Sequence, residues 1–128
     1  MRIILDTCTF LWLIAGSRQL SATARRAFRT EDNEFFLSAA SAWEIALKYA
    51  AGRLKLADPP SLLVPKERER HGIEELTVTE ADALSAGRLP ELHRDPFDRL
   101  LIAQALTRGF QILTPDELIA RYPVQTVW

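Results

Sequence analysis

The chain has 128 residues, a formal net charge of −1, 48% hydrophobic residues and 26% charged residues. These are ordinary globular values, so we expect one folded domain over residues 1–128 rather than a disordered segment. The near-neutral charge argues against nucleic-acid binding by bulk electrostatics. Contact with a polyanion would then depend on local arginines or on a metal ion. The single cysteine, Cys8, argues against an internal disulfide and a thiolate metal cage.

The chain shows no sign of a membrane segment or a leader. No apolar run approaches the ~20 residues that a bilayer-spanning helix needs. The N-terminal stretch MRIILDTCTF puts a charge directly after a short apolar run, which is unlike a secretory signal peptide. We therefore expect a cytoplasmic protein with no membrane partner.

The predicted elements alternate along the chain between strands and helices. In the first half we expect a strand over 3–5, a helix over 7–15 ended by Gly16, a helix over 21–30 capped by Ser21, a strand over 34–37 and an alanine-rich helix over 38–52. In the second half we expect a helical piece over 61–72 interrupted near Pro65, a weaker strand over 73–78, a short helix from Thr79 to Gly87, a helix over 96–108, a strand over 111–113, a helical turn over 116–121 and a last strand over 124–127.

This alternation predicts an α/β fold with a parallel sheet and helices on both faces. Functional sites in such sheets form just beyond the carboxyl ends of the strands. Asp6 directly follows the first predicted strand, and Asp116 follows the strand over 111–113. Each also has a purely structural interpretation, Asp6 as a helix N-cap and Asp116 as a turn residue.

Two further acids lie in the first turn or two of helices that follow connections at the same predicted edge. Glu44 lies in an apolar helix one turn before Lys48, where an ion pair or a capping box with Ser41 would also explain it. Asp98 lies in the first turn of the helix that starts in HRDPFDRLL, where it can simply face the helix dipole. Asp95, before a proline, is the expected N-cap of that helix.

Taken together, the four acids predict a site for a divalent cation. Four carboxylates at one edge would repel each other and lose solvation unless a divalent cation neutralised them. Oxygen ligands favour Mg²⁺ or Mn²⁺ over zinc. Such a site suits hydrolysis of a phosphodiester by metal-activated water.

At these residues the chain resembles the PIN-domain ribonucleases, specifically the VapC toxins of type II toxin–antitoxin pairs. The matching stretches span almost the whole chain in the family's order: IILDTCTFLWL, SAASAWEIALKYAAGRL, HRDPFDRLLIAQA and ILTPDELIARY. The resemblance implies a three-layer α/β/α sandwich with a mostly parallel sheet. It also implies an endoribonuclease that uses Mg²⁺, with Mn²⁺ as a substitute, to arrest growth by cleaving RNA such as a tRNA or rRNA loop.

The resemblance assigns Asp6, Glu44, Asp98 and Asp116 to the family's catalytic acids. Asp6 and Asp98 match the usual direct Mg²⁺ ligands, while Glu44 and Asp116 would act directly or through water. Pro115 departs from the family pattern, where a small, non-proline residue is usual. It stiffens the loop that carries Asp116 toward the metal.

The family also implies a homodimer and a cognate antitoxin protein. The apolar stretch FLWLIA around Trp12 independently suggests a surface covered by a partner subunit. Basic side chains near the acids are candidate RNA-phosphate contacts, with solvated side chains as the alternative: Arg94, Arg99, Lys48 and Arg53. Trp43, at helical spacing from Leu47, is expected in the core rather than on a base-stacking surface.

Two other function classes deserve comparison. A phosphatase with an aspartate after its first strand would need a second aspartate two residues later, where this chain has Cys8. A non-catalytic PIN-like binding module would keep the fold and lose acids, whereas all four are present.

Overall fold

The computed structural model describes residues 1–128 and contains one five-stranded sheet in the order β3-β2-β1-β4-β5. Every pair of neighbouring strands is parallel. The strands are β1 Arg2–Leu5, β2 Glu34–Ser38, β3 Ile73–Leu76, β4 Gln111–Leu113 and β5 Thr126–Val127. The predicted parallel sheet is confirmed, although the last strand is two residues shorter than expected.

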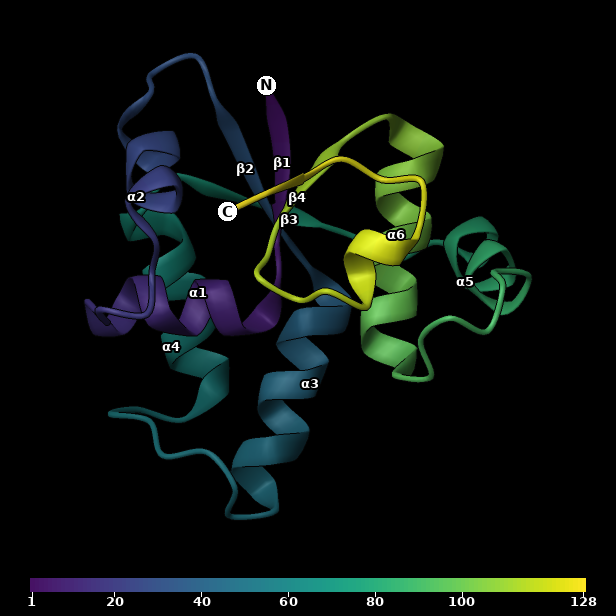
Figure 1. The fold of residues 1–128 in the computed structure, drawn as a ribbon. Helices are drawn as coiled ribbons and strands as arrows, with labels where there is room; N and C mark the ends of the chain where they lie inside the picture. The colour runs from purple at the N-terminus through teal and green to yellow at the C-terminus, as the bar shows by residue number, and fades with distance from the viewer.

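Helices cover both faces of this sheet (Figure 1), which gives the predicted three-layer α/β/α sandwich. The helices are α1 Thr7–Ala15, α2 Ala22–Arg29, α3 Ala39–Ala50, α4 Pro60–Arg70, α5 Glu80–Gly87 and α6 Pro96–Arg108, with a 3₁₀ turn η1 at Ile119–Arg121. Their bounds agree with the sequence predictions to within about two residues for most elements, and α1 and α6 match the prediction at both ends. No helix is both long enough and apolar enough to cross a membrane.

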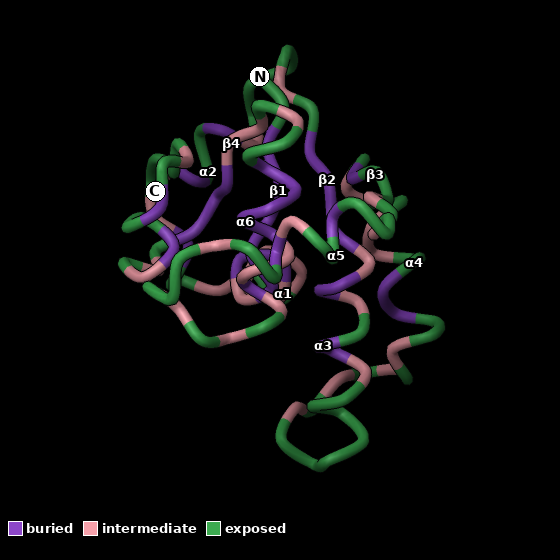
Figure 2. Tube along the Cα trace, turned by 90° about the vertical axis from the view of Figure 1, so that its right-hand side faces the viewer, coloured by how far each residue is buried: buried purple, intermediate pink, exposed green.

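Strand β1 joins the two apolar cores because its successive side chains point to opposite faces. Ile3 and Leu5 pack with Phe10 on one face, and Ile4 packs with Leu101 on the other. Ile3, Ile4 and Leu5 each have 0% exposure, as a central parallel strand requires. Figure 2 shows this buried centre and the exposed outer turns of the helices.

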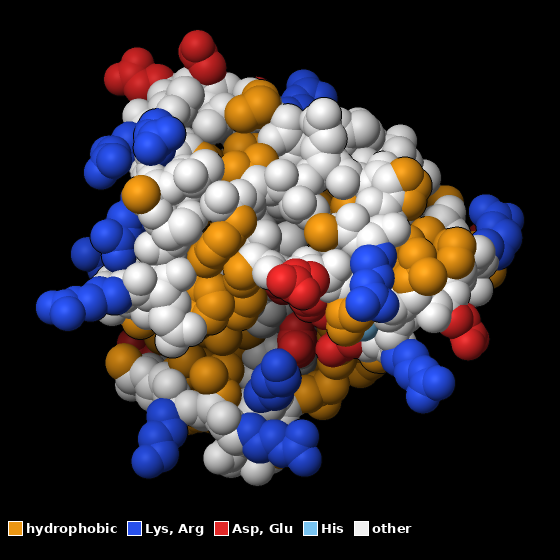
Figure 3. Space-filling model, in the orientation of Figure 1, with side chains coloured by type: hydrophobic (Ala, Val, Ile, Leu, Met, Phe, Trp, Pro, Cys, Tyr) orange, Lys and Arg blue, Asp and Glu red, His pale blue; other side chains and the backbone are white.

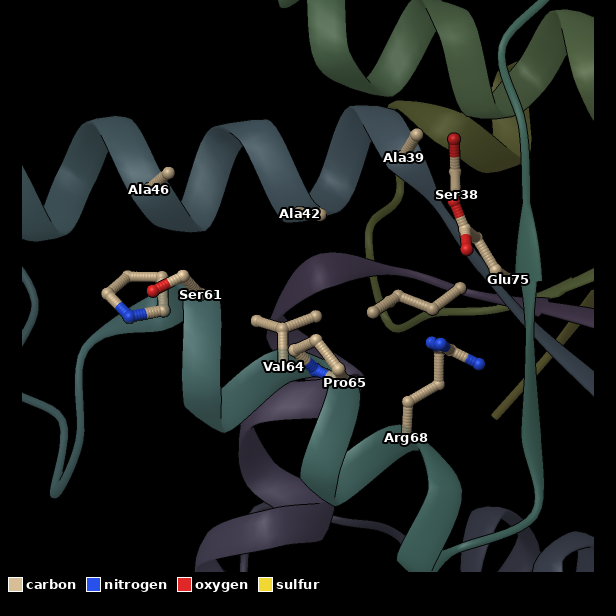
Figure 4. A pocket seen from close by; sticks show the side chains of 11 residues that line it. Ser38, Ala39, Ala42, Ala46, Ser61, Val64, Pro65, Arg68 and Glu75 are labelled. Carbon is tan, nitrogen blue, oxygen red and sulfur yellow. The ribbon is translucent and has the colours of Figure 1, made fainter.

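Helix α4 corrects one prediction. It continues through Pro65, although a proline inside a helix removes one backbone hydrogen bond. The two preceding residues, Leu63 and Val64, are each 7% exposed, so their burial in the core holds the helix across this position. Figure 4 shows Val64 and Pro65 on the side of α4 that faces Ala42 of α3, around a cavity of about 310 Å³ that none of the four predicted acids lines.

Helix α5 is fixed to α6 by a buried aspartate. The predicted N-cap Thr79 forms a capping box with Asp82. The Asp82 carboxylate also accepts hydrogen bonds from Arg108, at 2.9 and 3.0 Å. This bonding, chiefly from Arg108, lowers the pKa of Asp82 to about 2.

The register of the central strands sets the geometry of the carboxyl edge. Leu5 of β1 lies opposite Leu113 of β4, and the backbone N–H of Asp6 donates to the Leu113 carbonyl at 3.2 Å. The next residues, Asp6 and Thr114, therefore leave the sheet side by side.

Candidate active site

Asp6 occupies the N-cap position of α1, but its side chain makes no capping hydrogen bond. Instead Oδ2 accepts a hydrogen bond from Thr114 Oγ1 at 2.6 Å and lies 3.6 Å from the Cys8 thiol. The residue is 5% exposed. Burial raises the pKa of Asp6 above its usual range, although these hydrogen bonds lower it. The negative charge of Asp116 adds to the rise. A simple cap would not need this buried, charge-crowded position.

Cys8 stays a protonated thiol beside Asp6. Burial, followed by the charge of Asp6, raises the pKa of Cys8 to about 12. Since the thiolate is the nucleophilic form, Cys8 is no candidate nucleophile at neutral pH.

The start of α6 presents Asp98 to the site. Asp95 caps the helix through Oδ1, which accepts from the N–H groups of Phe97 at 2.9 Å and Asp98 at 3.2 Å. This confirms Asp95 as the N-cap and leaves the Asp98 carboxylate free of a capping role. Asp98 is 9% exposed. Burial, then the charges of Asp6 and Asp95, raise the pKa of Asp98 to about 7.

His93, which is not among the four predicted acids, lies between two of them. His93 Nε2 is 2.7 Å from Asp98 Oδ2 and 3.6 Å from Asp116 Oδ2. Donor atoms of His93, Asp98 and Asp116 all lie within 4.8 Å of one another. His93 precedes Asp98 by five residues, with Pro96 between them. Neither helical nor strand periodicity therefore predicts that their side chains meet.

Asp116 is held by the short turn that follows β4. Its backbone N–H donates to Thr114 Oγ1 at 3.0 Å, and its Oδ1 accepts from the Leu118 N–H at 2.8 Å. Oδ2 is then the oxygen that faces His93. The predicted helical turn starts later than expected, at Ile119, because this side-chain turn comes first.

Glu44 is a buried residue of α3. It is 6% exposed, and its Oε2 accepts from Lys48 Nζ at 2.7 Å. Its other oxygen, Oε1, is buried without any hydrogen-bond partner. The predicted ion pair is confirmed, whereas the capping box with Ser41 is wrong because Ser38 caps α3.

Hydroxyl groups tie these elements together. Ser41 Oγ accepts from Thr7 Oγ1 at 2.9 Å, which joins α3 to α1. Thr9 Oγ1 donates to the Leu113 carbonyl at 2.9 Å, which joins α1 to β4. The helices that carry Asp6 and Glu44 are thus fixed to each other and to the strand that leads to Asp116.

The four predicted acids do not form one tight cluster. Asp98 and Asp116 share His93, and Asp6 lies close enough for its charge to raise the pKa of Asp98. Glu44 lies outside the group of His93, Asp98 and Asp116. It faces the start of α6 through Lys48, whose pKa is raised by the hydrogen bond to Glu44 and further by the charges of Asp95 and Asp98. Figure 3 shows acidic side chains gathered between α1, α3 and α6 with basic side chains around them.

This donor set fits a hard divalent cation. Asp6, Glu44 and Asp98 are buried and Asp116 is half-buried, and like charges raise the pKa of Asp6 and of Asp98, which a bound cation would offset. The unpartnered Oε1 of Glu44 is a buried acceptor with no protein donor, and such groups call for a water or an ion. Asp6, Asp98 and Asp116, with Glu44 directly or through water, are the residues that would hold it.

The four candidate RNA-binding cations occupy different environments. The Arg99 guanidinium donates to four backbone carbonyls, those of Pro90, His93, Ala86 and Leu89, at 2.8 to 3.1 Å. These bonds fix the loop before α6 and leave little of Arg99 for phosphate. Lys48 pairs with Glu44. Arg94 and Arg53 are exposed and make no ion pair.

Trp43 contradicts its predicted place in the core. Its side chain is 60% exposed, and that of Leu47, one turn later, is 46% exposed. The prediction failed because most of α3 is apolar, so the sequence does not mark which of its faces lies outward.

A family model for the PIN domain matches residues 3–125, and the chain belongs to the PIN-domain family. Among its relatives is Ribonuclease VapC22 of Mycobacterium tuberculosis, which is 30% identical over 131 aligned residues covering 98% of each chain. Ribonuclease VapC16 of the same organism is 45% identical over 49 residues, 38% of this chain and 35% of its own. The predicted kinship with VapC ribonucleases is confirmed.

Solved structures show the same fold at low sequence identity. VapBC2 from Rickettsia felis, bound to a DNA fragment from its promoter, matches 98% of this chain and 97% of its own with a TM-score of 0.72 and 16% identity. DNA-bound VapBC from Salmonella typhimurium matches 98% of this chain and 96% of its own with a TM-score of 0.68 and 19% identity.

Proposed function

We propose that this chain is a Mg²⁺-dependent endoribonuclease, with Mn²⁺ as a substitute, and the toxic component of a toxin–antitoxin pair. The observation that carries the proposal is the group of Asp6, Asp98 and Asp116 at the carboxyl edge of the sheet. Asp6 and Asp98 are buried and Asp116 is half-buried. The charge of Asp116 raises the pKa of Asp6, and the charge of Asp6 raises the pKa of Asp98. Kinship with a VapC ribonuclease over 98% of each chain supports the same chemistry. The acids Asp6, Glu44, Asp98 and Asp116 act within one domain, residues 1–128.

In this proposal a bound divalent cation supplies charge neutralisation at the phosphate and a water of lowered pKa. The protein's own residues position the carboxylates that would hold the cation. Thr114 holds one oxygen of Asp6, and His93 holds one oxygen of Asp98, so each carboxylate keeps its other oxygen for the site. Lys48 fixes Glu44, and the exposed Arg94 and Arg53 are the candidates for RNA phosphates flanking the cleaved bond.

The partners follow from kinship and from surface chemistry. The similar solved structures are VapBC complexes, and we propose a cognate antitoxin for this chain as well. An apolar hollow of about 460 Å³ between α1 and α4, lined by Leu11, Trp12 and Ile14 among others, supports a protein partner there. A homodimer, a tRNA or rRNA loop as substrate and a cytoplasmic location complete the proposal.

RNA cleavage by the purified protein tests it. We expect cleavage of single-stranded or loop RNA with Mg²⁺ or Mn²⁺ and none with EDTA, and loss of cleavage in Asp6→Asn. Glu31→Gln, at an exposed acid remote from the site, is the matched control and should cleave normally. Expression alone should arrest growth, and Asp6→Ala should relieve the arrest. RNA binding without cleavage under any divalent metal would favour the non-catalytic binding module.

A further inference from the structure

Two aromatic side chains, the exposed Trp43 and the half-buried Phe97, meet beside the acidic site. The rings of Trp43 and Phe97 meet edge to face, with centroids 5.3 Å apart and planes at 75°. Trp43 directly precedes Glu44 on α3, and Phe97 directly precedes Asp98 on α6. Trp43 is 60% exposed, although an aromatic ring gains from burial. We call Trp43 and Phe97 the aromatic platform.

Cationic groups lie next to this platform. A hollow of about 320 Å³ opens between α3 and the start of α6, and it is lined by Glu44, Leu47, Lys48, Ala51, Arg53 and Phe97. Its volume is at the lower end of the range of about 300–1,000 Å³ that holds small ligands. Lys48 is tied to Glu44, whereas Arg53 makes no ion pair and remains available for an anion.

We propose that the aromatic platform binds one unpaired RNA base next to the bond that is cut, with Arg53 on the neighbouring phosphate. Stacking on an aromatic ring beside a cation is how proteins hold single-stranded nucleic acid with little sequence preference. A paired base cannot present its face to Trp43, so the platform selects single-stranded or loop RNA. This inference rests on the proposed nuclease function, to which it adds the residues that hold an unpaired base beside the cut.

Charge favours RNA over a second copy of the chain as the occupant. In a two-fold dimer the same patch meets itself, which would bring Lys48 and Arg53 of one copy toward those of the other. A polyanion instead complements Arg53, which has no ion pair, while the base covers the exposed indole. Glu44, which lines the same hollow, and Asp98, which follows Phe97 in the chain, mark the side toward which the backbone of the RNA would run.

Binding of a fluorescent single-stranded oligoribonucleotide in an Asp6→Asn background tests the platform without cleavage. We expect Trp43→Ala to weaken binding about 5- to 100-fold, the loss that one base–aromatic stack gives, while Trp43→Phe keeps most of the affinity. Leu62→Ala, at an apolar side chain that is 62% exposed elsewhere, is the matched control and should bind normally. Equal affinity of the Trp43→Ala and Leu62→Ala proteins would overturn the inference.

An oligonucleotide with one abasic position, moved along the sequence, identifies the stacked base. At that position the abasic RNA should bind weakly and Trp43→Ala should add no further loss, because both changes remove the same contact. If the two losses add at every position, no base stacks on Trp43. Thermal unfolding of each variant checks that the fold is intact.

Two further outcomes separate this inference from its alternatives. If sedimentation shows that Trp43→Ala turns a dimer into a monomer while affinity for RNA per chain is unchanged, the surface is a subunit interface and the inference is wrong. If RNA binding depends on Trp43 but no metal supports cleavage, the platform stands and the proposed nuclease function fails.

Discussion

The imidazole of His93 and the carboxylate of Asp98 form a 2.7 Å contact through Nε2 and Oδ2. The N–H of Asp95 lies 3.5 Å from the other ring nitrogen, Nδ1, which assigns the acceptor role to Nδ1 and the proton to Nε2. His93 therefore donates to Asp98 and holds one of its oxygens. Histidine and carboxylate partners of metal ligands orient them in this way.

Removing this donor should raise the pKa of Asp98 further. The His93 hydrogen bond lowers that pKa against the effect of burial, so in His93→Ala the carboxyl should ionise only above pH 7. At pH 7 we expect Mn²⁺ to bind about 10- to 100-fold more weakly than to the wild type, since outer partners of metal ligands are typically worth that much. Calorimetric titration at pH 7 and pH 8.5 measures this. An equal loss at both pH values would show that His93 does not act through the ionisation of Asp98.

The stability of the metal-free protein should fall as pH rises through neutrality. The pKa of Asp98 is about 7 in the fold against an ordinary value of 3.8, so the folded state favours the protonated form. That contribution to stability is complete below pH ~4 and is lost as pH rises toward and past 7. Urea unfolding in EDTA between pH 4 and pH 8 should show the decline in the wild type and a shallower one in Asp98→Asn. An equally steep decline in both proteins would show that Asp98 is not the source of the pH dependence.

The same crowding predicts a stabilised variant. Asp98→Asn removes a negative charge next to Asp6 and Asp95, and it should raise the melting temperature in chelator. It should also abolish the further rise that Mg²⁺ gives the wild type, because a direct ligand is gone. Differential scanning calorimetry with EDTA and with Mg²⁺ gives both readouts. A normal Mg²⁺ response in the variant would exclude Asp98 from the metal site.

Sequence reasoning located the sheet edge because that edge follows from simple rules. A short fully apolar run such as Ile3 to Leu5 predicts a buried strand, and parallel strands bring their carboxyl ends together. The caps at Ser21, Asp95 and Thr79 are local signals, and all three are confirmed. What depends only on neighbouring residues was therefore predictable.

The rest depends on contacts between distant segments. His93 reaches Asp116 because the loop before α6 is folded by Arg99, which donates to the carbonyl of His93 and to that of Leu89 earlier in the loop. Pro65 stays helical because α4 is packed, and Trp43 is exposed because α3 turns that face outward. None of these relationships has a period or a motif in the sequence.

Two neighbouring arginine sites should separate stability from RNA binding. Arg99→Ala leaves carbonyls in the loop before α6 without donors, and it should cost about 2–4 kcal/mol of unfolding free energy, since each lost bond to a charged donor is worth about 1.5–3 kcal/mol and water replaces some of them. Arg94→Ala, at an exposed residue, should leave stability within about 0.5 kcal/mol but weaken RNA binding. Urea unfolding and fluorescence anisotropy compare the two. A stable Arg99→Ala protein would show that the loop holds without it.

The hydroxyl of Thr114 should tune the metal site through Asp6. It donates to Asp6 Oδ2 at 2.6 Å, and this bond lowers the pKa of Asp6 against the effect of burial. Thr114→Val keeps the shape and removes the donor, so the pKa of Asp6 should rise and Mg²⁺ should bind more weakly at neutral pH. Because Thr114 Oγ1 also accepts from the Asp116 N–H, the turn that holds Asp116 should loosen as well. Thr114→Ser restores the hydroxyl and should restore Mg²⁺ affinity. If Val and Ser variants bind Mg²⁺ equally, the hydroxyl does not prepare Asp6 for the cation.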